Sequence, residues 1–271
     1  MIIGSEIYPI QLCSDSMKLA KDHLQVAQSG AVFIVEQLAH AHGRQGRDWL
    51  VSDGQLALTI LLKPAQDRIR SGGPDGAPVI SQELNYLNMA LSLGILEPLK
   101  KYGVGLKWPN DFFVHDKKVG GMLLESVWSG QSIGLVGVPD LAGVILGFAL
   151  NINNSFDCSH ELFSKAMSLH ELAGNSFDIV LLQDDILAEL DIWYQKWCAG
   201  DFETIFDAWK KNQIYMGKKI SVHNTDKSVM NGIFIDLLSN GDLVLKDDHG
   251  VMHTISFCSV SALNPVLSSG W

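Results

Sequence analysis

The sequence predicts an α+β fold in which helices flank a mixed or antiparallel sheet, followed by a small C-terminal β-barrel. Apolar residues recur at helical spacing near the start, middle and end of the first 215 residues, and strand-like apolar runs cluster between them. After Tyr215 only short strand-like runs remain, separated by turn residues. The strict alternation of strand and helix that is typical of a parallel sheet is absent. We therefore predict a large unit over residues 1–215 and a small one over residues 216–271.

The elements of the large unit follow from the spacing of its apolar residues. Helices are predicted over residues 16–28 and 81–102, behind the good N-cap Asp178, and after Asp201. Strands are predicted over residues 31–36, 56–62, 105–108, 112–115, 119–127, 133–138 and 143–152. Many of these runs are apolar throughout, as expected for a sheet covered on both faces. The turn-rich segment 71–78 predicts a surface loop between a strand and a helix.

Four short strands are predicted in the small unit, over residues 218–223, 229–238, 243–246 and 251–257. DK, NGD and DHG turns separate them, which is typical of a small barrel or a curled sheet. A unit of about 55 residues forms only a marginal core. We therefore expect this unit to pack on the larger one.

Composition excludes several classes of protein. The 271 residues are 47% hydrophobic and 18% charged, as in a globular chain, and carry a formal charge of −10. A general nucleic-acid binder would be basic, so we expect no nucleic-acid partner. The start lacks a signal peptide, and the longest apolar stretch, residues 133–152, is interrupted by Pro139 and Asp140, so no membrane partner is expected either. Dispersed cysteines without a CxxC pair fit reduced thiols and a cytoplasmic protein: Cys13, Cys158, Cys198 and Cys258.

A glycine- and arginine-rich loop over residues 42–49, HGRQGRDW, is the first candidate for chemistry. Gly43 lets backbone amides approach an anion, and Arg44 and Arg47 present planar charged forks for phosphate or carboxylate oxygens. The loop matches neither a P-loop nor a dinucleotide fingerprint. A solvated basic turn is the alternative interpretation.

The second candidate is KWPND, followed closely by DKKVGGMLLE. Pro109 interrupts strand pairing, so the chain bends there, and a second turn returns Lys118 and the glycine pair 120–121 alongside Lys107. Two lysines, the Asp111 carboxylate and glycines on adjacent strands are suited to bind a phosphorylated intermediate. A polar hairpin with surface lysines is the alternative.

The third candidate is GVILGFALNIN, an apolar strand that ends in Asn151 and Asn153. Gly147 in the middle of the strand indicates the close approach of a ligand or of another backbone. By itself, this segment fits a central core strand with turn-forming asparagines.

Together the three segments, in this order and spacing, resemble the biotin protein ligases. HGRQGRDW is similar to the family's GRGRxGRxW loop, KWPND is identical to its core signature, DKKVGGMLLE resembles its xKxxGxLxE strand, and LGFALNIN resembles its GxGxNxN strand. The resemblance implies a class II synthetase-like catalytic domain and an SH3-like C-terminal β domain. Because it begins near Gln11 and leaves no room for a preceding helix-turn-helix domain, it implies the monofunctional type without DNA binding.

The resemblance further implies a two-step reaction that uses biotin, ATP and Mg²⁺. Biotinyl-5′-AMP forms first, and a lysine of a biotin carboxyl carrier protein domain then takes the biotinyl group. The implied catalytic residues are Lys118 at the junction of carboxylate and phosphate, Asp111 near the incoming lysine, Arg44 over the adenylate, and Lys107. The implied binding residues are Ser16, Met17, Lys18, Leu38, His42, Gly43, Arg44, Arg47, Trp49 (stacked on adenine), Asn110, Lys118, Gly121, Gly147 and Asn151.

The chain departs from the family pattern in the part that would hold biotin. Met17 and Lys18 stand where the family usually carries Thr and Asn, so only Ser16 of that triplet remains to bond the ureido ring. Leu38 stands where a glutamine is expected, although Gln37 is adjacent. These departures leave open the affinity for biotin and the identity of the acid.

Two other functions stay open. A ligase for lipoate or octanoate is the nearest enzymatic alternative, although its RRxSGGG element is missing. A non-catalytic regulator that binds biotin or its adenylate is the alternative from another class, and exposed strand edges leave a homodimer open. Metal ligands stay unknown. Mg²⁺ would come with ATP and be held largely by phosphates. A zinc site would need four ligands at a recognisable spacing, which is absent from the set His40, His42, Cys158 and His160.

Overall fold

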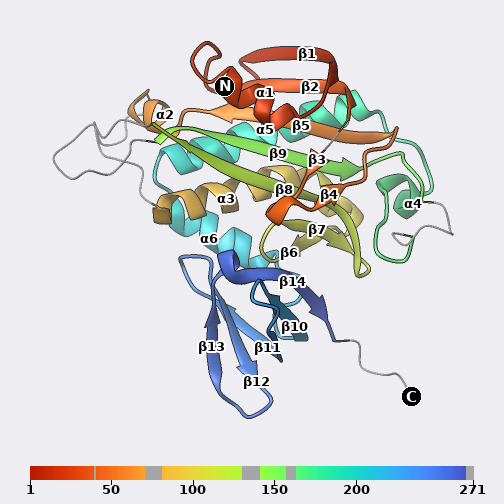
Figure 1. Cartoon of the computed structure of the whole chain (residues 1–271), viewed down its shortest axis with the longest axis vertical. Coiled ribbons are helices and arrows are strands. Elements are labelled where there is room, and N and C mark those ends of the chain that lie inside the picture. Colours follow the sequence, from red (N-terminus) through yellow and green to blue (C-terminus); the bar gives the residue numbers. More distant parts are fainter. Residues whose placement is uncertain (40, 71–80, 130–140, 157–162, 267–271) are drawn as a thin grey trace.

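The computed structural model describes residues 1–39, 41–70, 81–129, 141–156 and 163–266. Its largest element is a seven-stranded sheet in the upper part of Figure 1, and a five-stranded sheet lies below it. In spatial order the larger sheet consists of β1 (Glu6–Cys13), β2 (Ala31–Leu38), β5 (Gln55–Leu62), β9 (Leu141–Asn151), β8 (Lys117–Trp128), β7 (Asp111–Val114) and β6 (Gly105–Lys107). The predicted α+β class is confirmed.

Strand pairing in the larger sheet is antiparallel except at one edge, where β1 runs parallel to β2. Helix α1 (Ser16–Asp22) lies in the crossover that such a parallel pair requires. The sequence did not predict β1, because Pro9 interrupts its apolar pattern. As an edge strand β1 accepts Pro9, whose missing N–H would break the ladder of a central strand. The sheet is therefore mixed, as the prediction allowed.

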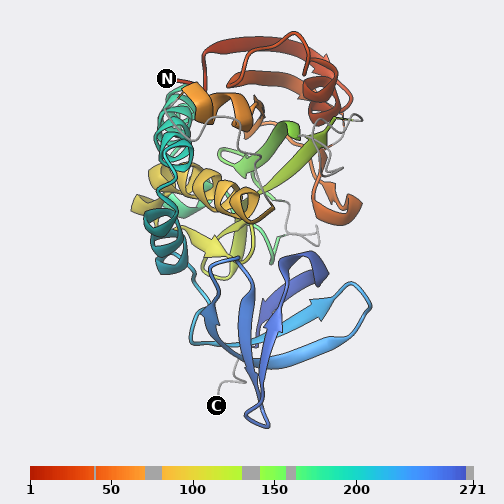
Figure 2. The ribbon, with the colours of Figure 1, turned by 90° about the vertical axis from the view of Figure 1, so that its left-hand side faces the viewer.

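Two hydrophobic clusters cover the two faces of this sheet. Leu58 and Ile60 belong to a large cluster with residues of α3 (Ser81–Leu96), α5 (Ile179–Cys198) and α6 (Phe202–Lys211). Phe33, Leu61 and Ile145 belong to a smaller cluster that includes residues of α1. Neighbouring residues of a strand point to opposite faces of the sheet. Helix α1 therefore lies on one side of the sheet, and α3, α5 and α6 lie on the other. Figure 2 shows α3, α5 and α6 gathered along one side of the molecule.

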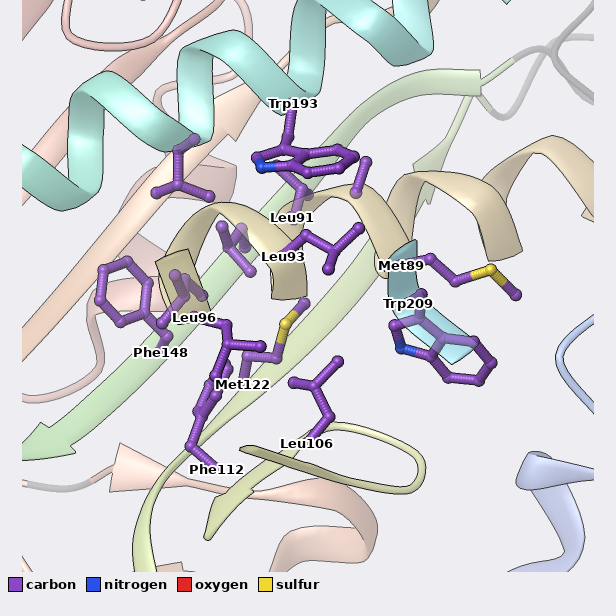
Figure 3. Packing of buried hydrophobic residues seen from close by; sticks show 14 of the residues in the cluster. Met89, Leu91, Leu93, Leu96, Leu106, Phe112, Met122, Phe148, Trp193 and Trp209 are labelled. Carbon is purple, nitrogen blue, oxygen red and sulfur yellow. The ribbon is translucent and has the colours of Figure 1, made fainter. Parts of the chain in front are cut away.

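The larger cluster is built around α3. Trp193 of α5 lies next to Leu91 on one side of α3, and Met122 and Phe148 of the sheet lie on its other side (Figure 3). Burying each of these side chains contributes about 1.5–3 kcal/mol. Helix α3 therefore packs against one face of β8 and β9, and α1 lies on the opposite face of the sheet.

The predicted N-terminal boundaries of α5 and α6 agree with the structure. The Asp178 carboxylate accepts hydrogen bonds from the backbone N–H groups of Val180 and Leu181, which confirms the predicted N-cap. The shorter helix predicted after Asp201 is α6.

Other helices differ from the prediction. The predicted helix 81–102 ends as α3 at Leu96 and continues as a 3₁₀ turn, η2 (Glu97–Tyr102), because Pro98 cannot donate to an α-helical ladder. Helix α1 ends at Asp22, earlier than predicted, and α2 (Pro64–Arg70) and α4 (Leu169–Ala173) were not predicted. The predicted loop 71–78 and strand 133–138 lie outside the described residues.

The smaller sheet follows the order β13 (Met252–Ile255), β12 (Leu243–Asp247), β11 (Val229–Leu237), β10 (Lys219–Asn224) and β14 (Val260–Pro265). All its pairs are antiparallel, and β14 is the strand that the sequence did not predict. The turn between β11 and β12 is bonded to the larger unit, because Trp108 Nε1 donates to Gly241 O at 2.9 Å and Asn85 Nδ2 donates to Asn240 O at 2.8 Å. The division at residue 215 stays a prediction.

The start of the chain is bonded to α5. The Asp191 carboxylate accepts from the backbone N–H groups of Ile2 at 2.5 Å and Ile3 at 2.9 Å. The Ile3 side chain is fully buried in the larger cluster. Across the described ranges, no helix has the length and apolar character needed to span a membrane.

Candidate active site

A row of small side chains crosses the face of the larger sheet that carries α1. Antiparallel pairing aligns Ala57 of β5, Ala149 of β9 and Gly121 of β8 side by side, and the row continues to Asp111 and Lys107. Alanines and glycine leave a shallow floor where a ligand can approach the backbone closely. Charged groups at one end of such a floor are well placed to bind the charged part of a ligand.

An ion pair closes the charged end of this floor. Lys118 Nζ lies 2.8 Å from Asp111 Oδ1, and their side chains are 33% and 35% exposed. A register shift between Phe112 and Phe113 makes this geometry, because it lets Gly121 face Asp111 while Lys118 is paired with the next part of β7. Because the pair is accessible from solvent, a ligand can reach the Lys118 ammonium.

Gly121 provides the space that the ion pair occupies. A Cβ atom at this position would lie 2.8 Å from Asp111 Oδ1 and 3.1 Å from Lys118 Nζ. The neighbouring Gly120 serves the opposite face, where a Cβ would meet the backbone oxygen of Ala149 at 2.6 Å. Gly121 therefore leaves room for the ion pair, and Gly120 leaves room for the packing of β8 against β9.

An aromatic and amide group lies at the end of the floor next to Lys118. The Trp49 ring centroid is 5.3 Å from Lys118 Nζ. Gln55 Nε2 donates to Asn151 Oδ1 at 2.9 Å, while Gln55 Oε1 accepts from Trp49 Nε1 at 3.4 Å. Asn151 Nδ2 donates to the Lys118 carbonyl at 3.4 Å. The structure thus brings together three residues that the sequence singled out, and Gln55, which it did not, connects two of them.

Asn110 supports the bend of KWPND. Its buried Nδ2 donates to the Met122 carbonyl at 2.9 Å, and the Met122 N–H donates back to the Asn110 carbonyl at 3.0 Å. The Trp108–Pro109 peptide bond in the same bend is cis. Asn110 therefore holds the start of β7, from which Asp111 reaches Lys118.

The other end of the floor is mostly apolar. Met17 on α1 lies against Gly147, where a Cβ would be 2.8 Å from the Met17 sulfur. Thr59, the partner of Gly147 across the strands, donates a 2.7 Å hydrogen bond to Ser16 Oγ. Thr59 is a polar group of this end that the sequence analysis did not single out. Lys18, which it did single out, forms an exposed ion pair with Asp22 at 2.8 Å.

Leu38 lies apart from this end of the floor along β2. Of the residues in β2, only 31–34 pair with β5, and Leu38 pairs with Cys13 of the edge strand β1 instead. A ligand contact of Leu38 stays a prediction.

The glycine-arginine loop (residues 42–49) is a small hairpin that faces the smaller sheet. Strands β3 (Ala41–His42) and β4 (Asp48–Trp49) pair, and the Gly43 N–H donates to the Arg47 carbonyl at 2.7 Å. His42 Nδ1 lies 3.6 Å from Asp48 Oδ1. Arg44 and Arg47 donate to backbone carbonyls of residues 257–261. The loop therefore connects Trp49, at the floor, to the C-terminal sheet.

Lys107 is the most perturbed cation of the site. Burial lowers the pKa of Lys107 to about 8, with Asp111 opposing that shift and Lys118 adding to it. Asp116 and Arg47 act on the same group more weakly, in the raising and lowering directions respectively. Its Nζ lies 4.1 Å from the Phe113 ring centroid, which favours the charged form. Lys107 is therefore charged at neutral pH and loses its proton near pH 8.

Replacing Lys107 by Met is expected to change how stability depends on pH. The folded-state pKa of about 8 lies below the ordinary value of 10.5, so the unfolded chain binds more protons between these pH values. The wild-type free energy of unfolding should therefore rise through this window, and Lys107→Met should remove that rise. Urea unfolding at pH 7 and pH 10 measures it, with exposed Lys101→Met as the control. Equal pH dependence in wild type and Lys107→Met would contradict the shift.

Comparison with known proteins relates the chain to one group of ligases. The sequence model of the biotin/lipoate A/B protein ligase family matches residues 11–138. The biotin–[acetyl-CoA-carboxylase] ligase of Paracoccus denitrificans is 26% identical over 245 residues, which are 88% of this chain and 93% of that protein. The chain is thus similar to this ligase family over much of its length. The bifunctional ligase/repressor BirA of Escherichia coli is 24% identical over 255 residues, 90% of this chain and 70% of that protein.

The ligase fold covers nearly the whole chain. The structure of the biotin protein ligase from Aquifex aeolicus in complex with biotin and ATP matches with a TM-score of 0.73 at 19% sequence identity, over 97% of this chain and 100% of that one. A biotin protein ligase-like protein of unknown function from Silicibacter matches with a TM-score of 0.64 at 13% identity, over 94% and 96% of the two chains. The predicted ligase-type fold with a small C-terminal β domain is confirmed.

A metal site built by the chain's own side chains is absent from the described ranges. Within them, no three His, Cys, Asp or Glu residues converge. Of the four residues weighed as zinc ligands, only His42 is described, and the others lie outside. The row across the floor offers one carboxylate, Asp111, which is paired with Lys118. This donor set fits a cation that arrives bound to phosphates, not a resident metal.

Proposed function

We propose that this chain uses ATP to convert biotin to biotinyl-5′-AMP and then transfers the biotinyl group to a lysine of a carboxylase carrier domain. The Lys118–Asp111 pair beside a floor of small residues carries the proposal. The small side chains leave room for a ligand, and in this proposal the ammonium binds both the carboxylate and the phosphate. The Paracoccus relative is named for this reaction.

In the first step a biotin carboxylate oxygen attacks the α-phosphorus of ATP, and the bond to pyrophosphate breaks. Both reactants are anions, so the Lys118 ammonium offsets their repulsion and the charge that develops on the phosphate. Asp111, 2.8 Å away, keeps that ammonium oriented. Lys107 adds a second positive charge in the same row below pH 8.

Trp49 and the amide pair of Gln55 and Asn151 offer the surface for the nucleotide base. An indole face stacks on adenine, and the amides are held in place by their mutual hydrogen bond of 2.9 Å. The bond from Trp49 to Gln55 fixes the ring beside Lys118. The adenylate would thus lie with its base at this end of the floor and its phosphate at Lys118.

In the second step the carrier lysine amine attacks the carboxyl carbon of the adenylate, an amide bond forms, and AMP leaves. Asp111 is 35% exposed and can accept a hydrogen bond from the incoming amine and then its proton. Proton transfer to Asp111 weakens its pairing with Lys118, which frees that ammonium for the departing AMP.

Mg²⁺ would enter with ATP and neutralise phosphate charge. Asp111 is the carboxylate nearest to the phosphate position in the floor, and its pairing with Lys118 leaves the phosphates and water as the main ligands. We also propose a cytoplasmic protein with no nucleic-acid or membrane partner, in keeping with a formal charge of −10. A homodimer would use the exposed edge of β1.

The apolar end of the floor supports a second candidate, a ligase for lipoate or octanoate. Met17 presents a thioether over Gly147, and Thr59 with Ser16 supplies a single hydroxyl pair. A ureido ring needs several polar partners, whereas an acyl chain or dithiolane needs apolar contact. Biotin remains the first choice because the Paracoccus relative, which matches 88% of this chain, is named a biotin–[acetyl-CoA-carboxylase] ligase.

Pyrophosphate release with ATP and Mg²⁺ tests these functions, with biotin, lipoate and octanoate supplied separately. Release with biotin alone is the expected result. Release with lipoate or octanoate alone would contradict biotin as the substrate and assign the sister activity. Release with none, together with tight binding of biotin by calorimetry, would contradict catalysis and assign a binding regulator.

A further inference from the structure

We propose that Gln45 is a positioning residue that docks the glycine-arginine loop on the edge of the C-terminal sheet and thereby keeps Arg47 near the floor. The docking itself is independent of the reaction, whereas its effect on ATP use rests on the proposed function. Gln45 lies in the 3₁₀ turn η1 (Arg44–Gly46) at the tip of the β3–β4 hairpin.

Three residues of this loop donate to backbone carbonyls of residues 257–261 in the C-terminal unit. Arg44 Nη2 donates to Phe257 O and, at 3.2 Å, to Val260 O. Gln45 Nε2 also donates to Val260 O at 3.2 Å, and Arg47 Nη2 donates to Ser261 O. These three acceptors are main-chain oxygens, so these bonds do not depend on which side chains the acceptor residues carry.

Gln45 is the centre of this contact because it uses both ends of its amide. While Nε2 donates to Val260, Oε1 accepts from Arg47 Nη2 at 3.4 Å. Arg44 shares the Val260 carbonyl, so Gln45 connects the two arginines. Its φ of 59° lies in the left-handed region, which is uncommon for a residue other than glycine. The backbone is therefore turned so that the amide reaches the sheet.

Two of the three acceptor residues, Val260 and Ser261, belong to the edge strand β14. β14 is the last strand of the five-stranded sheet, and its outer side has no strand partner there. Backbone groups on an open edge need donors from elsewhere, and the loop supplies them. A cleft of about 590 Å³ runs beside the contact, lined by Gln45, His223, Asn224, Thr225, Lys227 and Ser261. Solvent therefore competes with the contact, which makes it sensitive to the loss of one side chain.

The consequence concerns the two guanidinium groups. Lys118 and Asp111 are held by the larger sheet, but Arg44 and Arg47 are held by the smaller one through the loop. Arg47 is close enough to Lys107 to lower its pKa, so the docked loop keeps this charge near the floor. Without Gln45 the loop would lose one hydrogen bond to the sheet and one between its own residues.

Trypsin cleavage after Arg44 and Arg47 measures docking directly in the full-length protein without ligand. We expect Gln45→Ala to raise the cleavage rate about fivefold, the effect of losing roughly one net hydrogen bond. Gln45→Asn is the matched variant, because asparagine favours the left-handed conformation but is one methylene too short to bridge. It should behave like Gln45→Ala. Wild-type cleavage rates in both variants would overturn the proposal, and a wild-type rate in Gln45→Asn alone would assign the effect to the backbone.

Steady-state pyrophosphate release separates positioning from a general loss of structure. Gln45→Ala should raise KM for ATP about fivefold and change kcat less than about twofold, because Lys118 and Asp111 keep their places. Lys227→Asn is the control. Lys227 lines the same cleft and makes no bond to the loop in the described structure, and asparagine tolerates the positive φ of this position. Equal falls in kcat and kcat/KM with unchanged KM would overturn the positioning role. If wild type releases no pyrophosphate with any acid, the proposed function fails while the cleavage rates still decide docking.

Discussion

Lys118→Ala is expected to abolish adenylate formation and leave the fold intact. The lysine side chain is one-third exposed, so its removal opens no cavity and leaves Asp111 facing solvent. Without the ammonium, the charge that most directly offsets the repulsion between carboxylate and phosphate is lost. Removal of one such charge-stabilising donor lowers kcat by about 10²–10³. Pyrophosphate release measures the loss, and thermal unfolding checks the fold.

The neighbouring lysine provides the control for this experiment. Lys117 is half-buried and donates to the Phe163 carbonyl at 3.2 Å, whereas Lys118 is paired with Asp111. Lys117→Ala should keep wild-type activity within about twofold. Near-normal adenylation by Lys118→Ala would show that the carboxylate and phosphate meet elsewhere and would remove the main support for the proposed mechanism.

Gly121→Ala is expected to lower kcat about tenfold or more with little change in stability. Its Cβ would lie 2.8 Å from Asp111 Oδ1 and 3.1 Å from Lys118 Nζ, so both charged ends must move apart. These atoms end flexible, partly exposed side chains, and their displacement costs the fold little. A change of about 1 Å in the position of reacting groups can lower the rate about 10²-fold.

Gly120→Ala is the matched variant one residue earlier. Its Cβ would meet the Ala149 backbone oxygen at 2.6 Å and the Leu150 side chain, neither of which can move freely within the packed sheet. We expect a loss of about 1–3 kcal/mol in unfolding free energy, measured with urea. Gly121→Ala with wild-type kcat, or the same stability loss in both variants, would contradict the division of roles between the two glycines.

The sequence predicted those parts of the fold that bury a regular apolar pattern. Helix α5 was found from its periodic stripe and from Asp178, and β5 and β9 from continuous apolar runs. The missed strands β1 and β14 lie at sheet edges, where tertiary pairing decides the conformation of mixed sequences such as VSALNP. Local preference is weak in such segments, so their partners determine their structure.

The candidate site follows the same division. Lys118, Asp111 and Gly121 could be grouped from the sequence because two turns in a short segment bring them together. Gln55 and Thr59 could not, since their importance arises from register: each faces a β9 residue about ninety positions away. Their polar character inside an apolar strand was the available signal. The docking of the loop on the smaller sheet had no signal in local sequence.

The bond between the start of the chain and α5 affects how the protein is made. Ile2 and Asp191 are 189 residues apart, so the first residues emerge from the ribosome long before their partner exists. At roughly 5–20 residues per second, the delay is roughly 10–40 s. During that time β1 lacks its anchor and the apolar Ile3 is exposed. A change at Asp191 should therefore reduce the yield of folded protein during synthesis more than the activity of the molecules that complete folding.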